Sequence, residues 1–355
     1  MLRTSPTEIV ATEVPLKIWF DADNGPHVLI MRPLVGELMS RGHHVVFTAR
    51  DRTNTCELLD LYGFEYRTVG GEYGRGMSGK VRGTLGRAWS LMGAMKGQNP
   101  DVSFGHGSRA LPIASRLMAV PSVTMYDYEW VDPRLFNWFC RGILMPAAIT
   151  PKRCREAGIS GRKVVNYPGF KEELYLGGKE FDTSIAPELG LRPEAVKVLL
   201  RPPATTAHYH NPEADTILES ILAKLATGQD VQLVYLPRTP DQADLPRKAG
   251  VSEIIIPDKV YDGPSLVAAM DMVISGGGTM TREAAILGVP SYSFFRGRSG
   301  KVDEALAESG RLTMVTAADD VMEKLAVVPN TRPVSRPESR PLVAFICDAI
   351  EQAAQ

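Results

Sequence analysis

The stretch SGGGTMTREAAILGVP, residues 275–290, places three glycines between an apolar run and a helical pattern. Gly276–Gly278 allow a tight turn with a close approach of the backbone to a ligand, and Thr279 is a fair N-cap. The unpaired N–H groups and the positive dipole end of such a helix suit a diphosphate. Glu283, one turn into the helix, could accept hydrogen bonds from both hydroxyls of a ribose. The residues alone also allow a plain turn, with Glu283 only complementing the helix dipole.

A second candidate site follows the first apolar run, in the loop FDADNGPHVLIMRPL. Asn24, Gly25 and His27 stand where a strand gives way to a helix. The loop resembles the glycine–histidine loop after the first strand of GT-B glycosyltransferases, which implies that His27 is a catalytic base or a contact to phosphate or acceptor. The alternative is a histidine that only caps the helix. The loop contains no G-x-G-x-x-G, and VVFTARD (residues 45–51) has no acid at its strand end. A dinucleotide oxidoreductase is therefore disfavoured.

Polar side chains follow two later strands of the same half. GHGS places His106 and Ser108 after one apolar run, and YDYEW places Asp127 and Glu129 after the next. Carboxylates and histidines at strand ends are suited to proton transfer. For His106, a turn histidine satisfied by the backbone remains an equal alternative.

Basic side chains follow two strands of the second half. Arg201 begins RPPATTAHYH and Arg238 ends LPR. Their fork-shaped guanidinium groups could offset the charge of a diphosphate, and the alternative is that they are surface arginines. His208 and His210 lie one residue apart with no third ligand, so neither a metal site nor a cofactor is predicted.

Two further segments have competing interpretations. Residues 74–80 match the G-x-x-x-x-G-K of a P-loop, but Val81 replaces the magnesium-binding hydroxyl, so a nucleoside triphosphatase is rejected. The surrounding residues 70–87 are rich in glycine and predict a mobile basic flap or, as the alternative, a solvated loop. The basic residues of this flap are Arg75, Lys80, Arg82 and Arg87. Residues 134–146, RLFNWFCRGILMP, predict buried core or a subunit interface, with contact to a membrane surface as the alternative.

The elements that must position these residues are short apolar runs alternating with helical patterns. This alternation predicts parallel sheets covered by helices, and two such series predict two Rossmann-like domains. One helix is expected between the first two strands, from Leu34, Leu38 and Met39, with Gly42 at its C-terminal end. The predicted strands are 16–20, 44–48, 64–69, 101–104, 122–125 and 147–150 in the first half, and 196–200, 231–236, 253–256, 272–275, 291–295 and 312–315 in the second. Ligands of parallel sheets bind beyond the carboxyl ends of the strands, where the candidates above were found.

Composition narrows the classes of function. The 355 residues suit two domains, and 40 basic against 41 acidic residues argue against a general nucleic-acid binder. The four cysteines form no C-x-x-C, which fits a reducing cytoplasm and argues against zinc and a disulfide framework. No segment approaches the ~18 uninterrupted apolar residues of a membrane span.

Several of these motifs carry a resemblance to known families. GGTMTREAAILGVP resembles the donor-binding signature of GT-B glycosyltransferases, especially the peptidoglycan N-acetylglucosaminyltransferase that acts on a lipid intermediate. GHGS resembles the H-G-D segment of the non-hydrolysing UDP-N-acetylglucosamine 2-epimerases, with Ser108 in place of the first acid. From Lys17 to Leu312 the chain resembles domain-of-unknown-function family 354. The pieces that carry this likeness are D-x-x-N-x-P-H (21–27), ELLDLYGFEY (57–66), PDVSFGHGS (100–108), RPP (201–203), LPR (236–238) and the glycine stretch.

The resemblance implies a GT-B fold, with two Rossmann-like domains whose parallel sheets face an interdomain cleft. We expect a disordered leader (1–15), an acceptor-side domain (16–170), a nucleotide-sugar-binding domain (171–330), and a proline-rich linker with a C-terminal helix returning to the first domain (331–355). The helix start would hold the nucleotide diphosphate, and Glu283 the ribose. His27 is the expected catalytic residue, with Asp127 or Glu129 as the alternative base. The expected substrate-binding residues are Asn24, Gly25, His106, Ser108, Arg201, Arg238, Ser275, Gly276, Gly277, Gly278, Thr279, Met280 and Glu283.

The implied activity is metal-independent transfer of a sugar from a nucleotide diphosphate, UDP in the first instance, to an acceptor hydroxyl. The acceptor would be anionic or lipid-linked, which is the ground for expecting peripheral membrane contact. A sugar-nucleotide epimerase of the same fold is the first alternative. A protein that binds a nucleotide sugar without turnover is the second.

Overall fold

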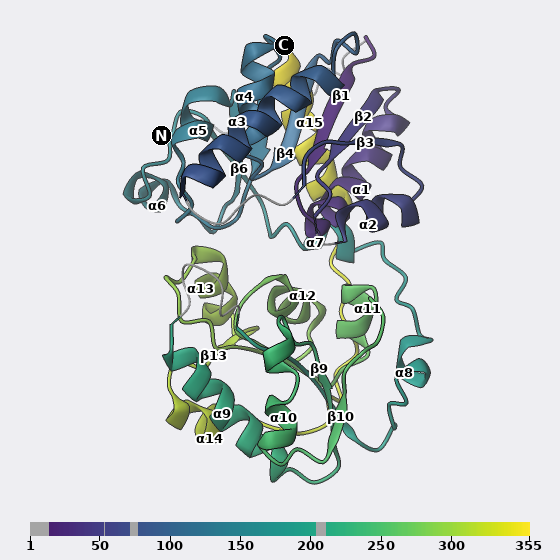
Figure 1. Ribbon diagram of the computed structural model, residues 1–355, viewed down its shortest axis with the longest axis vertical. Coiled ribbons are helices and arrows are strands. Elements are labelled where there is room, and N and C mark those ends of the chain that lie inside the picture. Colours follow the sequence, from purple (N-terminus) through teal and green to yellow (C-terminus); the bar gives the residue numbers. More distant parts are fainter. Residues whose placement is uncertain (1–13, 53, 72–76, 204–210) are drawn as a thin grey trace. The chain divides into compact units, whose positions relative to one another are not determined.

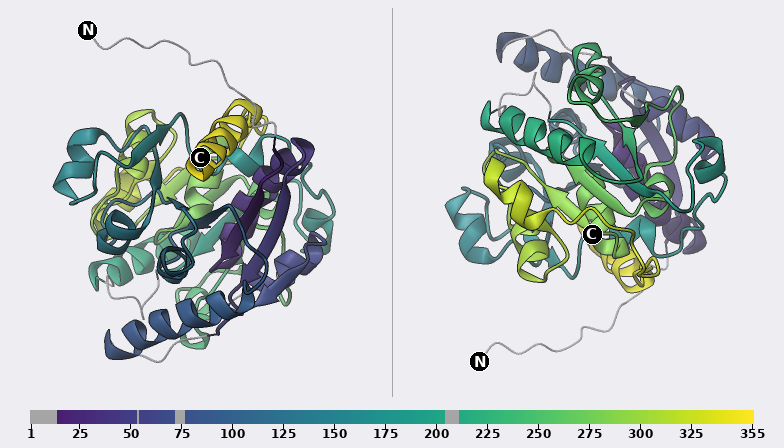
Figure 2. Two further views of the ribbon diagram at one scale, coloured as in Figure 1. Left: turned by 90° about the horizontal axis from the view of Figure 1, so that it is seen from above. Right: turned by 90° about the horizontal axis from the view of Figure 1, so that it is seen from below.

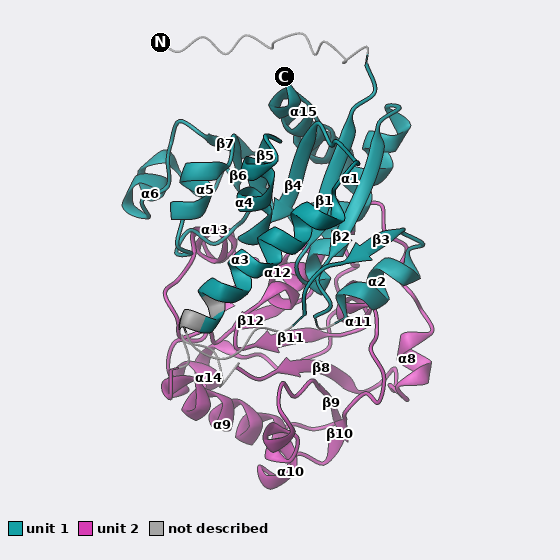
Figure 3. Ribbon diagram, turned by 45° about the horizontal axis from the view of Figure 1, so that its top comes forward, with its two compact units in different colours: residues 1–175, 339–355 teal, residues 176–338 magenta. Residues whose placement is uncertain are grey.

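In the computed structural model, residues 14–52, 54–71, 77–203 and 211–355 are described. The chain divides into unit 1, residues 1–175 with 339–355, and unit 2, residues 176–338 (Figure 3). Residues 1–13 of the predicted leader, the segment 72–76 of the predicted flap with Arg75, and both His208 and His210 lie outside the described residues.

Unit 1 is built on a seven-stranded parallel sheet with the order β3-β2-β1-β4-β5-β6-β7 (Figure 1). Its strands are β1 (Lys17–Ala22), β2 (His44–Ala49), β3 (Tyr66–Thr68), β4 (Val102–His106), β5 (Ser122–Met125), β6 (Gly142–Pro146) and β7 (Val164–Tyr167). Its helices are α1 (Gly25–Ser40), α2 (Thr55–Leu61), α3 (Met77–Ala94), α4 (Ala110–Leu117), α5 (Arg134–Phe139), α6 (Pro151–Glu156), α7 (Glu173–Leu176, at the boundary) and α15 (Arg340–Ala354).

The side chains of β1 alternate between two cores, as the two-residue period of a strand requires. Ile18 and Phe20 pack in a core with residues of α1 and α15. Trp19 packs in a second core with residues of α3 and α4. Asp21 therefore points to the same face as Trp19, toward α3, which matters for the site described below.

The C-terminal helix α15 belongs to unit 1 although unit 2 precedes it in the chain. Leu342, Ile346 and Ile350 are buried in the core that α1 and the sheet also form. Arg41 donates to Asp348 at 2.6 Å, which adds an ion pair between the end of α1 and the helix. Figure 2 shows α15, in yellow, from two further directions.

Unit 2 repeats the plan with a six-stranded parallel sheet in the order β10-β9-β8-β11-β12-β13. Its strands are β8 (Val196–Arg201), β9 (Val231–Tyr235), β10 (Glu253–Ile255), β11 (Met272–Ser275), β12 (Ser291–Ser293) and β13 (Thr313–Met314). Its helices are α8 (Ile185–Glu188), α9 (Glu213–Ala226), the 3-10 helix η1 (Pro240–Gln242), α10 (Leu245–Lys248), α11 (Gly263–Ala268), α12 (Thr279–Leu287), α13 (Lys301–Glu308) and α14 (Ala318–Lys324).

Both sheets share one strand order, in which the first strand lies between the second and the fourth. The predicted pair of Rossmann-like units with parallel sheets is therefore confirmed. The order reverses between β1 and β4 in unit 1 and between β8 and β11 in unit 2. Ligands of such sheets bind at these switch points.

The structure differs from the expected strands at one place and contains one strand that was not expected. The prediction of a strand at 147–150 is wrong, because the strand is β6 (Gly142–Pro146) and the next residues lead into α6. Gly142 and Pro146 are uncommon inside strands, so the sequence pattern did not indicate one there. The last four residues of the strand are nevertheless buried. Strand β7 was not predicted. Met39, expected on the apolar face of α1, is 60% exposed.

The finding on β6 also confirms buried core for the second half of residues 134–146 and contradicts the alternative of a membrane contact there. Their second half is a buried strand of the sheet and cannot lie on a membrane surface. Among the described residues, no helix combines the length and apolar character needed to cross a bilayer.

Candidate active site

The predicted site residues gather at the switch points of the two sheets. In unit 1, Asp21 of β1 pairs in register with Gly105 of β4. In unit 2, Arg201 of β8 pairs with Ser275 of β11.

The N-terminus of α1 positions His27. The Asn24 side chain caps the helix by accepting from the Gly25 N–H at 3.1 Å, and Pro26 follows in the first turn. A side chain at Gly25 would come within 2.2 Å of Asn54 Oδ1, so the Asn54 side chain would have to move to admit one. Asn24 and Gly25 thus shape the turn that presents His27, whatever else they contact.

His27 lies against His106, with ring centroids 4.8 Å apart. Nδ1 of His27 is buried and has no hydrogen-bond partner among the described residues, while the residue as a whole is only partly buried. Burial, followed by the neighbouring His106 and Lys171, holds the pKa of His27 well below its usual value. The imidazole is therefore neutral near pH 7, which a general base requires.

Asp127 stands between a histidine and a lysine. Its Oδ2 lies 2.6 Å from Nζ of Lys171, and its Oδ1 lies 3.9 Å from Nε2 of His106. Lys171 is 5% exposed and also pairs with the fully buried Glu172. The structure thus brings His27, His106, Asp127 and the unpredicted Lys171 into one cluster.

Glu129 forms an ion pair with Arg153 instead of joining this cluster. Its side chain is fully buried, and its Oε1 accepts from Nε of Arg153 at 2.9 Å. The guanidinium of Arg153 also stacks over Trp130 at 4.8 Å. These contacts describe a structural ion pair and leave little of the carboxylate open to a substrate.

Ser108 belongs to a buried network that sequence reasoning missed. Its hydroxyl donates to Asp21 Oδ2 at 2.7 Å, and the Thr48 hydroxyl donates to Asp21 Oδ1 at the same distance. Arg87 of α3 binds both oxygens of Asp21, at 2.7 and 2.8 Å. Arg87 is 3% exposed, so the prediction that it lies in a mobile flap is wrong.

Asp23 is a further acid at this edge. It lies 3.4 Å from Arg50 and 3.6 Å from Arg87, and its side chain is 22% exposed. Burial raises the pKa of Asp23 above its usual value, against the opposing charge of Arg87. It is the acid of this loop that remains partly accessible, since Asp21 is fully buried.

In unit 2 the three glycines form the turn into α12. Gly277 and Gly278 have φ values of 107° and 121°, which L side chains rarely adopt. A side chain at Gly276 would come within 2.7 Å of Pro203 Cα, and one at Gly277 within 2.7 Å of the Phe295 ring. Gly278 is the N-cap, so the expectation that Thr279 caps the helix is wrong. Because glycine has no side chain to accept from them, the first N–H groups of α12 are not capped by this residue.

Arg238 and Arg201 both reach this turn. Arg238 donates from Nη2 to the Gly277 carbonyl at 3.0 Å and from Nε to the Pro202 carbonyl at 2.8 Å. Arg201 Nη1 lies 3.7 Å from the sulfur of Met280. Burial lowers the pKa of Arg201, while the charge of Glu283 opposes that shift. A second negative group would stabilise the charge of this half-buried guanidinium.

Glu283 lies in the second turn of α12 and is 3% exposed. A side chain at Gly263, which begins α11, would lie 4.0 Å from Glu283 Oε2. Ser275 turns inward, because its hydroxyl donates to the Gly277 carbonyl at 3.1 Å. The described residues contain no cluster of three metal-ligating side chains.

Comparisons with known proteins give the family and the fold. Residues 16–349 match the family described as "Protein of unknown function (DUF354)", and the chain belongs to that family. An uncharacterized protein of Methanocaldococcus jannaschii is 27% identical over 306 residues, which span 84% of this chain and 87% of that protein.

Solved structures with the same fold include two epimerases and MurG. The UDP-N-acetylglucosamine 2-epimerase of Rickettsia bellii has a TM-score of 0.68 at 15% identity, with 96% of each chain covered. The Neisseria meningitidis UDP-GlcNAc 2-epimerase, solved with UDP-GlcNAc bound, has a TM-score of 0.64 at 13% identity and covers 95% of this chain and 100% of its own. MurG of Acinetobacter baumannii has a TM-score of 0.54 at 14% identity, with 95% and 100% covered. The predicted GT-B fold and the family resemblance are confirmed.

Proposed function

We propose that this member of the family is an enzyme that transfers a sugar from a nucleotide diphosphate to an acceptor hydroxyl. The fold is shared with proteins solved with UDP sugars, which supports a nucleotide-sugar substrate. The protonation and pairing of the polar side chains in unit 1 favour sugar transfer over epimerisation. His27 is neutral and partly exposed, whereas the carboxylates of Asp127 and Glu129 are engaged by Lys171 and Arg153.

We assign donor binding to unit 2. The diphosphate would accept hydrogen bonds from the first N–H groups of α12, where the glycines keep side chains out of the way. Arg238, fixed by two backbone carbonyls, and the half-buried Arg201 would offset the charge of the leaving nucleotide. Glu283 would accept from the ribose hydroxyls after a small movement, since the side chain is 3% exposed.

We assign proton transfer to unit 1. As the acceptor oxygen forms its bond to the anomeric carbon, the bond from that carbon to the diphosphate oxygen breaks. His27 takes the proton of the acceptor hydroxyl, and the nucleoside diphosphate leaves with the bonding electrons. His106 and Lys171 would keep the pKa of His27 low enough for the ring to enter the reaction unprotonated.

An epimerase is the second candidate, favoured by two observations. The epimerases above have higher TM-scores than MurG, and Asp127 lies beside His106 as proton-transfer groups do. Against it, Ser108 is engaged with Asp21 and is not a base near neutral pH. Membrane contact and a lipid-linked acceptor remain proposals that rest on the sequence resemblance.

Incubation with UDP-N-acetylglucosamine in heavy water, without an acceptor, tests the proposal. We expect slow hydrolysis of the donor, abolished in His27→Gln, and no deuterium in the sugar. Deuterium uptake that is lost in Asp127→Asn or Glu129→Gln would replace the transferase with the epimerase. Tight binding with neither outcome, repeated over other nucleotide sugars, would leave a protein that binds without turnover. The hydrolysis should persist with a chelator present, and a strict need for a divalent cation would refute the account of diphosphate binding.

A further inference from the structure

A cavity of about 330 Å³ lies in unit 1, at the edge of the sheet opposite the candidate active site. Its lining includes Pro121, Arg141 and Lys163, and each of these directly precedes one of the strands β5, β6 and β7. The strands are parallel, so this is the amino-terminal edge of the sheet. The candidate catalytic residues follow the carboxyl ends of the strands, and the cavity therefore has no part in the activity proposed above.

The cavity is positively charged without a counter-ion of its own. Arg116, Arg141 and Lys163 line it, and no acid does. Neither guanidinium has a salt bridge or a side-chain hydrogen bond to any residue that the structure describes. Lys163 Nζ donates only to neutral carbonyls, those of Asn137 at 2.6 Å and Cys140 at 2.7 Å. In a chain of net charge −1, three cations so placed favour an anionic ligand.

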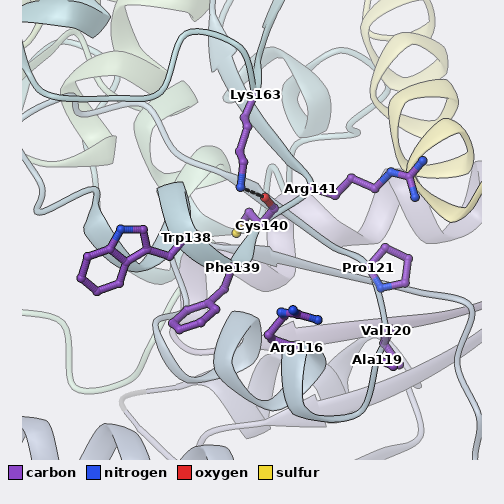
Figure 4. A pocket seen from close by; sticks show the side chains of 9 residues that line it. All are labelled: Arg116, Ala119, Val120, Pro121, Trp138, Phe139, Cys140, Arg141 and Lys163. Carbon is purple, nitrogen blue, oxygen red and sulfur yellow. Dashed lines mark hydrogen bonds between the residues drawn. The ribbon is translucent and has the colours of Figure 1, made fainter.

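The same cavity offers aromatic surface. Trp138 and Phe139 end helix α5 and line the cavity, with ring centroids 6.4 Å apart and nearly perpendicular planes. Trp138 is 66% exposed, although an indole of this size is more often largely buried. Figure 4 shows both rings on one side of the lining, Pro121 and Arg141 on the other, and the Arg116 side chain between them.

We propose that this cavity binds a small phosphorylated molecule carrying a flat ring, of the nucleoside monophosphate class. The phosphate would meet Arg116 and Arg141, since planar guanidinium groups bind phosphate through paired hydrogen bonds. The base would stack on Trp138, as bases do on exposed aromatic side chains. The volume falls in the range of small-molecule sites, about 300–1,000 Å³. Three cations and two aromatic rings gather in this one concavity, which favours a ligand that carries both a phosphate and a ring, and a lipid surface is an outcome of the test below.

Tryptophan emission of the full chain, titrated with adenosine and uridine monophosphate, tests this site. We expect a change in emission that Trp138→Phe removes. Arg116→Ala and Arg141→Ala should each weaken binding about tenfold, the effect of one exposed charge-assisted phosphate contact. Arg162→Ala, which removes an exposed charge next to Lys163 but outside the lining, should change affinity less than twofold. Inorganic phosphate and adenosine alone should bind more weakly than the monophosphates.

Repeating the titration with Arg238→Ala tests whether the emission change arises from the proposed donor site. The variant should leave the binding of nucleoside monophosphates unchanged. The proposal is overturned if neither nucleotide alters the emission, or if Arg162→Ala weakens binding as much as Arg116→Ala. It is also overturned if vesicles with anionic phosphatidylglycerol alter the emission while free nucleotides do not. That last result would assign the three cations to a membrane surface instead.

Discussion

Removing the guanidinium of Arg87 should strongly destabilise unit 1, because the buried Asp21 carboxylate would lose its counter-ion. The two side chains are 1% and 0% exposed. Breaking such a pair from one side costs about 3–5 kcal/mol. Asp21 would keep the hydroxyls of Thr48 and Ser108, each at 2.7 Å. We therefore expect Arg87→Met to lower the free energy of unfolding by about 3 kcal/mol, the lower end of that range.

Urea unfolding followed by tryptophan emission measures this loss. The four tryptophans, Trp19, Trp89, Trp130 and Trp138, all lie in unit 1, so their emission reports on that unit. With a urea slope of about 1–3 kcal/mol per molar, the midpoint should fall by about 1–3 M. Arg82→Met is the matched control, because Arg82 is on the same helix and exposed.

A double variant distinguishes a charge pair from simple packing. Asp21→Asn combined with Arg87→Met removes both charges and should be more stable than the sum of the single losses predicts. The reasoning is refuted if Arg87→Met unfolds at the same urea concentration as Arg82→Met. Additive losses in the double variant would also show that Asp21 and Arg87 do not act as a pair.

Three further changes test other parts of the account. As pH falls below about 6.5, the unfolded chain takes up a proton at His27 before the folded chain does, so unit 1 should lose stability. In urea melts, His27→Gln should reduce that loss, and an unchanged pH profile would contradict the prediction. Gly277→Ala should cost unit 2 about 1–3 kcal/mol by thermal circular dichroism, because of its φ of 107° and the Phe295 ring, whereas Gly178→Ala has open space and should cost less than half of that. Glu283→Gln should weaken UDP-sugar binding by about 1–3 kcal/mol in calorimetry, and an unchanged affinity would remove the ribose assignment.

The sheets were predictable because their strands are apolar runs bounded by polar residues and glycines. The expected strands 196–200 and 272–275 agree closely with β8 and β11, and so the glycine turn was placed at the correct edge. Strand β7 has only one fully buried residue, Tyr167, and its pattern is correspondingly weak. Because β7 was missed, Lys171 was never recognised as a residue that follows a strand.

Pairing partners were the part that the sequence could not supply. Asp21 and Arg87 are 66 positions apart, and Asp21 and Ser108 are 87 apart, so no local spacing links them. The glycine-rich segment around Arg87 has the composition of a solvated loop. It forms part of α3, however, and the Arg87 side chain is buried against the sheet. Likewise, the sequence suggests that Glu129 is an accessible acid, because its hydrogen-bond partner Arg153 lies 24 positions later. The catalytic and binding roles of the candidate residues stay predictions.

The return of α15 to unit 1 has a consequence for biosynthesis. Residues 339–355 complete unit 1, so all of unit 2 is made between its first part and its last helix. On the ribosome, unit 2 is continuous and free to fold, while the surface of α1 that receives Leu342, Ile346 and Ile350 stays uncovered. Apolar surface left uncovered in this way is prone to aggregation until the helix has been made. Synthesis of residues 339–355, rather than translation of the first 175 residues, is therefore the event that closes the N-terminal core.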